Sequence, residues 1–122
     1  MLFNWEQYLS LAQELRQRTE SDQAAMRSAV SRAYYAAFNK AADRMEAEGE
    51  PRPTSGDSHR IVWEYYKKRP DRFRRQIGED GQRLKRQRIE ADYRGGVNIR
   101  SAQVEDCLIK AGRVLDRLTK LR

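Results

Sequence analysis

The chain has 122 residues, of which 39% are hydrophobic and 35% are charged, and its formal net charge is +7. This length suits a single domain over residues 1–122, and the composition indicates a modest core beneath a heavily charged surface. One cysteine excludes a disulfide scaffold, and the absence of any apolar run near ~18 residues excludes a membrane span. No signal peptide is visible, so we expect a cytoplasmic protein with no membrane partner.

The first half of the chain carries two helical patterns. Apolar residues recur every three or four positions over residues 4–18, and Asn4 is a suitable N-cap, so a helix is predicted there. Residues 22–48 contain no proline or glycine and are rich in alanine, which is the best helix former. A longer helix is therefore predicted over this range, and its small side chains would let another helix approach closely.

Proline and glycine divide the second half of the chain. Residues 49–57 hold two prolines and two glycines and are predicted to form a loop, after which Asp57 or Ser58 can cap a short helix over residues 58–68. Residues 71–93 form the next helical segment. Glycines weaken helices, so a break is expected at residues 78 and 81, with a firm helix from residue 82.

The last helix is predicted to begin at Ser101, its expected cap, and to continue to the end of the chain. The pair Gly95 and Gly96 before it would stop the preceding helix. No alternating strand pattern of useful length is present. The chain is therefore predicted to be all-α, an up-and-down bundle of four to five helices.

All of the excess charge lies in residues 67–88, which hold ten lysines and arginines but only three acidic residues. A concentrated basic surface attracts polyanions with an affinity that falls as salt rises. Arginine outnumbers lysine seven to three here, and its guanidinium binds phosphate bidentately. Nucleic acid is the expected ligand, while a solvated face and a docking site for a protein partner are the alternatives.

Titratable groups suited to catalysis are scarce. The chain has one histidine, His59, and one cysteine, Cys107, and it has no spacing typical of a metal site or a phosphate-binding glycine loop. We therefore expect neither a metal nor another cofactor. His59 is interpreted as a surface or helix-capping residue, and Cys107, which lies in an apolar stripe, as a buried thiol.

Two short stretches combine arginine with tyrosine. In RSAVSRAYYAAF, residues 27–38, polar and aromatic side chains recur at three- and four-residue steps and share one side of a helix. In RQRIEADY, residues 86–93, Arg88 and Asp92 are four apart and can form an ion pair. Aromatic core packing and an ordinary helical ion pair are the respective alternatives.

These stretches resemble the motifs of a known family. SRAYYAAF, residues 31–38, is similar to the helix-two signature of HEPN domains, and RIEADY, residues 88–93, is similar to the arginine-x-x-Ala-Asp-Tyr form of their late motif. With the loop and the Ser58–His59 helix start, the resemblance covers nearly the whole chain. It implies an up-and-down helical bundle that is usually a homodimer. Many HEPN proteins are metal-independent endoribonucleases in toxin–antitoxin and defence systems, and others accompany a minimal nucleotidyltransferase.

In the nucleases of the family, a histidine follows the motif arginine by a few residues, and two protomers bring these pairs together in a basic cleft. Arg88 fills the arginine position here, but Tyr93 stands where the histidine would be. Tyrosine, with an ordinary pKa of about 10, is a poor base at neutral pH.

Three interpretations follow. One is an RNA-binding component of a toxin–antitoxin or defence module with weak endoribonuclease activity. Another is a non-catalytic subunit that partners a nucleotidyltransferase or antitoxin, or that binds a nucleotide. The third is a purely structural interaction module.

The resemblance assigns candidate roles to individual residues. Arg88 and Tyr93 are the candidate catalytic residues, and the candidate RNA-binding residues are Arg32, Tyr35, Arg83, Lys85, Arg86 and Asp92. Five of these eight are predicted to converge on one polar pocket near a dimer axis, namely Arg32, Tyr35, Arg88, Asp92 and Tyr93. Because Tyr93 lies about 140° around the helix from Arg88, the two side chains are expected to flank a cleft rather than to point the same way.

Overall fold

The computed structural model describes residues 2–121, and all regular secondary structure in this range is α-helical. The helices are α1 (Glu6–Arg16), α2 (Gln23–Ala47), α3 (Ser58–Lys67), α4 (Arg72–Tyr93) and α5 (Ser101–Lys120). The predicted all-α bundle is confirmed, and each predicted range agrees with the observed helix to within two residues at either end. Over residues 2–121, no helix combines the length and apolarity needed to cross a membrane.

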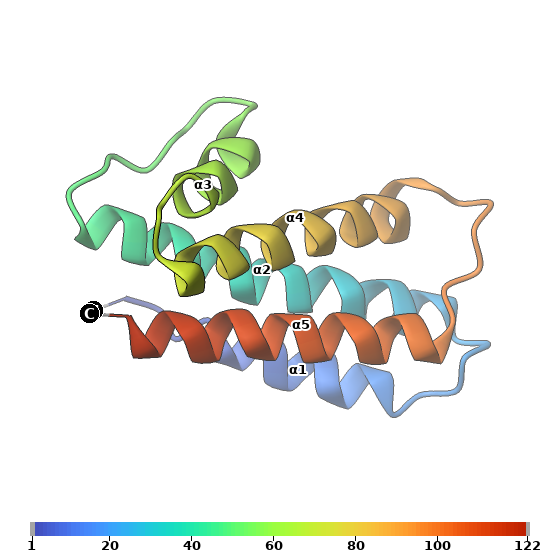
Figure 1. Cartoon of the computed structure of the whole chain (residues 1–122). Helices are drawn as coiled ribbons and strands as arrows, with labels where there is room; N and C mark the ends of the chain where they lie inside the picture. The colour runs from blue at the N-terminus through green and yellow to red at the C-terminus, as the bar shows by residue number, and fades with distance from the viewer. Residues whose placement is uncertain (1, 122) are drawn as a thin grey trace.

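The helices α1, α2, α4 and α5 run lengthwise, and α3 is turned across one end of them (Figure 1). Two loops, between α1 and α2 and between α4 and α5, lie at the same end of the bundle, so the members of each pair run in opposite directions. The helix α2 contacts each of the other helices. It is therefore the element against which the rest of the fold is arranged.

Small side chains explain how one helix can contact all the others. Much of the buried face of α2 is alanine, and the fully buried ones include Ala33, Ala36, Ala37, Ala41 and Ala42. Side chains of this size keep neighbouring helix axes close, and alanine also favours the helix itself. Asp22 begins α2 by accepting a hydrogen bond from the backbone N–H of Ala25 at 3.1 Å. The alanine-rich stretch thus acts as the centre of the bundle.

The break predicted near Gly78 and Gly81 is wrong, because α4 is one continuous helix (Figure 1). Both glycines lie where α3 packs against α4. A Cβ on Gly81 would lie 2.1 Å from the ring of Trp63, and one on Gly78 would lie 2.7 Å from backbone atoms of α3. Trp63 is fully buried by this close approach. Burial of the indole therefore outweighs the helix propensity, about 1 kcal/mol per residue, that glycine loses relative to alanine.

The start of α5 also differs from the prediction. Its N-cap is Arg100, not Ser101. The carboxylate of Glu20 accepts a hydrogen bond from the backbone N–H of Ser101 at 2.6 Å, and the side chain of Gln103 accepts one from Arg100 at 2.8 Å. An acidic side chain near a helix N-terminus is stabilising because of the helix dipole. The loop between α1 and α2 therefore caps α5 from a distance in sequence.

Glu48, the C-terminal cap of α2, ties α2 to α3 and α4. It accepts hydrogen bonds from Arg74 at 2.8 Å and from the hydroxyl of Tyr65 at 2.6 Å. The hydrogen bond from Arg74 lowers the pKa of Glu48 to about 2, although partial burial acts in the opposite direction. The carboxylate is therefore charged at neutral pH and fixes the end of the bundle where α3 crosses.

Gly81→Ala is expected to destabilise the protein by about 1–3 kcal/mol, because the added methyl group would overlap the buried Trp63 ring. Gly112→Ala is the matched control: the position is helical, but a Cβ there meets nothing within 4 Å. That variant is expected to gain up to about 1 kcal/mol from helix propensity. Urea unfolding followed by circular dichroism measures both. Equal stabilities of the two variants would contradict the close packing of α3 on α4.

Candidate nucleic-acid interface

Arg88, in the last part of α4, is held by three neighbouring side chains. Its Nε donates to Asp92 at 2.8 Å, and its Nη2 donates to the hydroxyl of Tyr93 at 3.2 Å. The guanidinium carbon lies 5.1 Å from the ring centre of Tyr35 and 5.2 Å from that of Tyr93. These distances are typical of cation–π contacts. The Arg88 side chain is thus oriented by one carboxylate and two aromatic rings.

Side chains of α2 also contact the residues around Arg88. Ser31 donates to Asp92 at 3.2 Å, and the guanidinium of Arg32 lies 5.8 Å from the ring centre of Tyr35. The five residues predicted to converge are therefore joined by contacts, and we refer to them as the Arg88 cluster: Arg32, Tyr35, Arg88, Asp92 and Tyr93. Arg32 also lies 4.8 Å from the ring centre of Tyr8 on α1.

The expected relation between Arg88 and Tyr93 is corrected by the structure. The two Cα positions lie well apart around the helix, but the side chains meet in a direct hydrogen bond. Both side chains are long, and Tyr93 is the last residue of α4, with 70% of its surface exposed. The tyrosine ring can therefore turn back along the helix end toward the guanidinium.

Arg27 holds the end of α4 in place, a role that the sequence did not indicate. Its guanidinium donates to the carbonyl oxygens of Ala91 at 2.9 Å and Arg94 at 3.1 Å, and also to that of Val97. Carbonyls at a helix C-terminus lack partners within the helix, and a basic group satisfies them. The spacing shows only that Arg27 lies one turn before Ser31, on the face of α2 that meets Asp92, and not which carbonyls it contacts.

His59 is not the surface or capping residue that was predicted. Its ring stacks on Phe38 with centres 4.2 Å apart, and its Nδ1 lies 2.6 Å from the hydroxyl of Tyr34. Burial lowers the pKa of His59, and the charges of Arg88 and Lys85 lower it further. The imidazole therefore belongs to an aromatic group beside the Arg88 cluster. The burial predicted for Cys107 is confirmed, and it raises the pKa of that thiol to about 12.

The remaining predicted RNA-binding residues do not all lie with Arg88. Lys85 precedes Arg88 by three residues on α4, about one turn, so it is on the side of the Arg88 cluster, and its charge lowers the pKa of His59. Arg86 is exposed, and no ion pair of this residue is found within residues 2–121. Arg83 instead contacts Asp80 at 3.4 Å, on the side of α4 that meets α5. The basic segment is thus divided between two faces of one helix.

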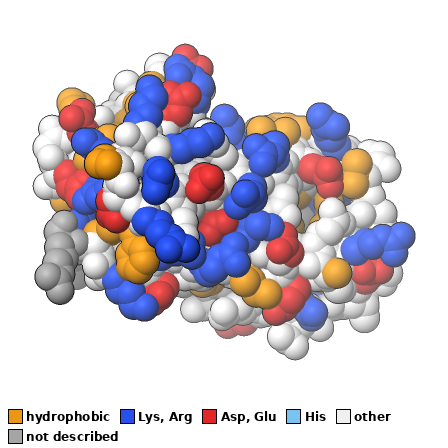
Figure 2. Space-filling view, viewed as in Figure 1, with side chains coloured by type: hydrophobic (Ala, Val, Ile, Leu, Met, Phe, Trp, Pro, Cys, Tyr) orange, Lys and Arg blue, Asp and Glu red, His pale blue; other side chains and the backbone are white. Residues whose placement is uncertain are grey.

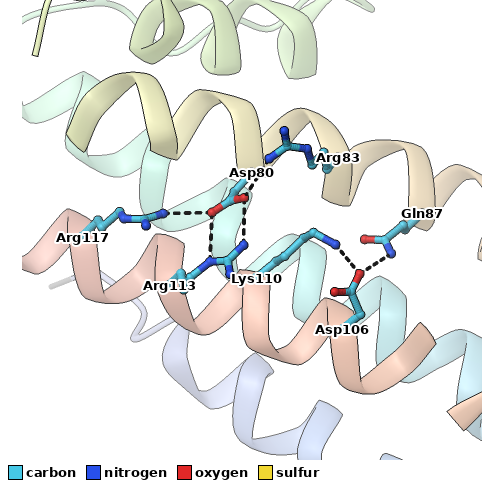
Figure 3. A network of polar contacts seen from close by, with 7 residues as sticks. All are labelled: Asp80, Arg83, Gln87, Asp106, Lys110, Arg113 and Arg117. Atoms are coloured by element: carbon cyan, nitrogen blue, oxygen red, sulfur yellow. Dashed lines mark hydrogen bonds and ion pairs between the residues drawn. The ribbon is translucent and has the colours of Figure 1, made fainter. Parts of the chain in front are cut away.

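The face toward α5 is organised by Asp80, whose side chain is only 5% exposed (Figure 3). Arg113 donates to both of its oxygens, at 3.1 and 3.2 Å, and Arg117 donates at 2.9 Å. With Arg83, three guanidinium groups surround one carboxylate. No motif singled out Arg113 and Arg117, although their four-residue spacing places both on one face of a helix.

The space-filling view shows how charged side chains are distributed on this face of the molecule (Figure 2). Basic side chains gather across the middle of this face, over α4 and α5, with acidic side chains among them. A hollow of about 260 Å³ lies over the buried carboxylate, lined by residues of α4 and α5, namely Gln76, Glu79, Asp80, Arg83, Arg113 and Arg117. Much of the positive charge on this face is therefore engaged in ion pairs within the protein.

Comparisons with protein-family models, with curated proteins and with solved structures find no match to this chain. Over residues 2–121, no group of three or more histidine, cysteine, aspartate or glutamate side chains is placed to hold a metal ion. The Arg88 cluster itself offers guanidinium, phenol and carboxylate groups, with the imidazole of His59 beside them.

Asp80→Ala is expected to destabilise the protein by about 1–3 kcal/mol, because three arginines would be left close together without their shared partner. Asp116→Ala is the control, since the ion pair of Asp116 found within residues 2–121 is with Lys120, and both side chains are about 60% exposed. Its effect is expected to stay below about 1 kcal/mol. Chemical denaturation at neutral pH measures both, and a tolerated Asp80→Ala would show that the arginines do not depend on this carboxylate.

Proposed function

We propose that this chain binds RNA through the Arg88 cluster, as a HEPN-type component of a toxin–antitoxin or defence module. The observation that carries the proposal is the geometry of Arg88. Within residues 2–121 its guanidinium makes two hydrogen bonds, from Nε to Asp92 and from Nη2 to Tyr93, whereas an arginine has five N–H donors. Because these contacts already hold the guanidinium in place, its remaining donors can bind a phosphate at a small further cost in conformational entropy.

The surroundings of Arg88 support a nucleic-acid ligand over a simple anion. Arginine beside exposed aromatic rings is the combination that binds single-stranded nucleic acid, since the guanidinium contacts phosphate and the rings stack on bases. Tyr93 is 70% exposed and next to the guanidinium. Arg32 and Lys85 add positive charge to that of Arg88, which is paired with the carboxylate of Asp92. The local charge is therefore suited to a polyanion.

Cleavage of RNA at this site would be metal-independent. The 2′-hydroxyl would lose its proton to water and attack the adjacent phosphorus, and the bond from phosphorus to the 5′-oxygen of the next nucleotide would break. The products would be a 2′,3′-cyclic phosphate and a free 5′-hydroxyl that takes up a proton from water. Arg88 would stabilise the charge that develops on the phosphate oxygens. Tyr93, hydrogen-bonded to Arg88, takes the place next to the reacting groups that histidine has in the nucleases which the chain resembles. The proposed activity is accordingly weak, and binding is the main function.

Arg88→Gln is expected to weaken binding of a labelled single-stranded RNA about tenfold and to reduce the salt dependence by about one phosphate contact. Lys68→Gln is the control, because it removes the same charge from the same basic segment at an exposed position far from the Arg88 cluster in sequence. It is expected to change the affinity by less than about threefold. Fluorescence anisotropy at several salt concentrations measures both variants.

Equal losses for the two variants would show that net charge, not the Arg88 cluster, binds the RNA. Incubation of the same samples with total cellular RNA in EDTA reports on cleavage. Products that appear with the unmodified protein and disappear with Arg88→Gln would assign nuclease activity to the cluster. Intact RNA in every sample would restrict the proposed function to binding.

The proposal includes a homodimer that brings two Arg88 clusters together. Support comes from exposed apolar side chains on α3 and α4, such as Ile61 and Phe73, which a second copy could cover. Light scattering at micromolar concentration is expected to give twice the chain mass of 14.4 kDa. A measured mass equal to that of one chain would contradict the dimer.

A further inference from the structure

Three buried or half-buried side chains form a hydrogen-bonded series that ends beside the Arg88 cluster. The indole Nε1 of Trp63 donates to the hydroxyl oxygen of Tyr34 at 3.0 Å, and that hydroxyl lies 2.6 Å from Nδ1 of His59. Trp63 and Tyr34 are fully buried, whereas His59 is only partly buried. The series therefore runs from the core toward the surface.

The order of donors in this series fixes the tautomer of His59. An indole N–H can only donate, so the Tyr34 oxygen accepts from Trp63 and its own proton needs another acceptor. A buried hydroxyl proton without a partner would cost free energy, and Nδ1 of His59 is the acceptor within reach. Tyr34 therefore donates to Nδ1, and the neutral imidazole carries its proton on Nε2.

The groups that face His59 keep the ring neutral. Burial lowers its pKa below the usual 6.5, and Arg88 and Lys85 on α4 act in the same direction. On its own helix, His59 is the second residue of α3, where the helix dipole disfavours an imidazolium, and the neighbouring Asp57 and Arg60 pair with each other at 3.4 Å. Protonation of Nδ1 would also leave the Tyr34 hydroxyl proton without an acceptor.

We propose that His59 donates a hydrogen bond from Nε2 to a phosphate oxygen of the RNA strand bound at the Arg88 cluster. This inference rests on the proposed RNA binding. The rings of His59 and Tyr35 lie 5.9 Å apart, and the guanidinium of Arg88 lies 5.1 Å from the same Tyr35 ring. No hydrogen bond of Nε2 is found within residues 2–121. A donor from α3 thus complements the arginine from α4 without adding a further positive charge.

The tautomer and the pKa can be measured without any ligand, because the chain has a single histidine. Long-range proton–nitrogen NMR is expected to show a protonated Nε2, an unprotonated Nδ1 and a pKa below 6.5. Tyr34→Phe removes the hydroxyl donor and is expected to raise this pKa. A proton on Nδ1, or a pKa of 6.5 or above in the unmodified protein, would overturn the inference.

Two amide substitutions of His59 test the roles of its two ring nitrogens separately. In His59→Asn the side-chain oxygen can still accept from Tyr34, but the outer donor is lost. In His59→Gln the longer amide can reach the outer position. His59→Asn is expected to weaken RNA binding about tenfold, and His59→Gln is expected to retain most of the affinity. Arg60→Lys, which preserves charge at the next residue, is the control and is expected to bind normally.

Homopolymeric RNAs distinguish a phosphate contact from a base contact. The loss in His59→Asn is expected to be the same for polyuridine and polyadenosine, because both have the same backbone. A loss confined to one of them would overturn the phosphate assignment. Equal affinities of the Asn and Gln variants would overturn the inference alone, whereas an unmodified protein that binds no RNA would overturn the proposed function and the inference with it.

Discussion

The side chain of Trp63 joins three helices at one buried point. Its ring lies against Gly81 of α4, so closely that a methyl group could not fit between them, and its Nε1 donates to Tyr34 of α2. The contact with Gly81 sets how closely α4 packs against α3. The hydrogen bond from Trp63 to Tyr34 connects α3 to α2. Arg88 lies about two turns further along α4 than Gly81 and shares its side of the helix, so the same contact brings it to Tyr35.

The basic segment shows why a count of charges along the chain differs from the charge that a surface offers. Because a helix repeats every 3.6 residues, Asp80 and Arg83 face α5 while Arg88 and Asp92 face α2. The α5 face joins its arginines to a buried carboxylate and holds two helices together. The α2 face joins its arginine to an exposed tyrosine, and a half-buried imidazole lies nearby. One sequence segment thus has a structural side and a side suited to a ligand.

Local pattern was enough to predict the helices, because alanine content, apolar spacing and the proline-rich loop act within a few residues of each other. The four-residue spacing was also enough to predict the ion pair of Arg88 with Asp92, whereas the position of Tyr35 beside Arg88 was expected only with the family resemblance. What the sequence did not indicate depends on packing between distant segments. Gly81 weakens an isolated helix, yet here it admits an indole from α3. Arg27 satisfies carbonyls that lie more than 60 residues away in the chain, which no spacing rule on its own helix can reveal.

A neutral imidazole beside arginines has a consequence for how binding responds to pH. The positive charges of Arg88 and Lys85 contribute to the low pKa of His59 in the free protein. A phosphate at the Arg88 cluster would offset those charges, so the pKa of His59 would rise on binding, although the hydrogen bond from Tyr34 would still oppose a proton on Nδ1. A group with a higher pKa in the complex takes up protons on binding, and affinity then increases as the pH falls through that pKa. In the free protein the lowered pKa favours the uncharged ring at neutral pH, so His59 offers a directed hydrogen-bond donor there, and the arginines contribute charge.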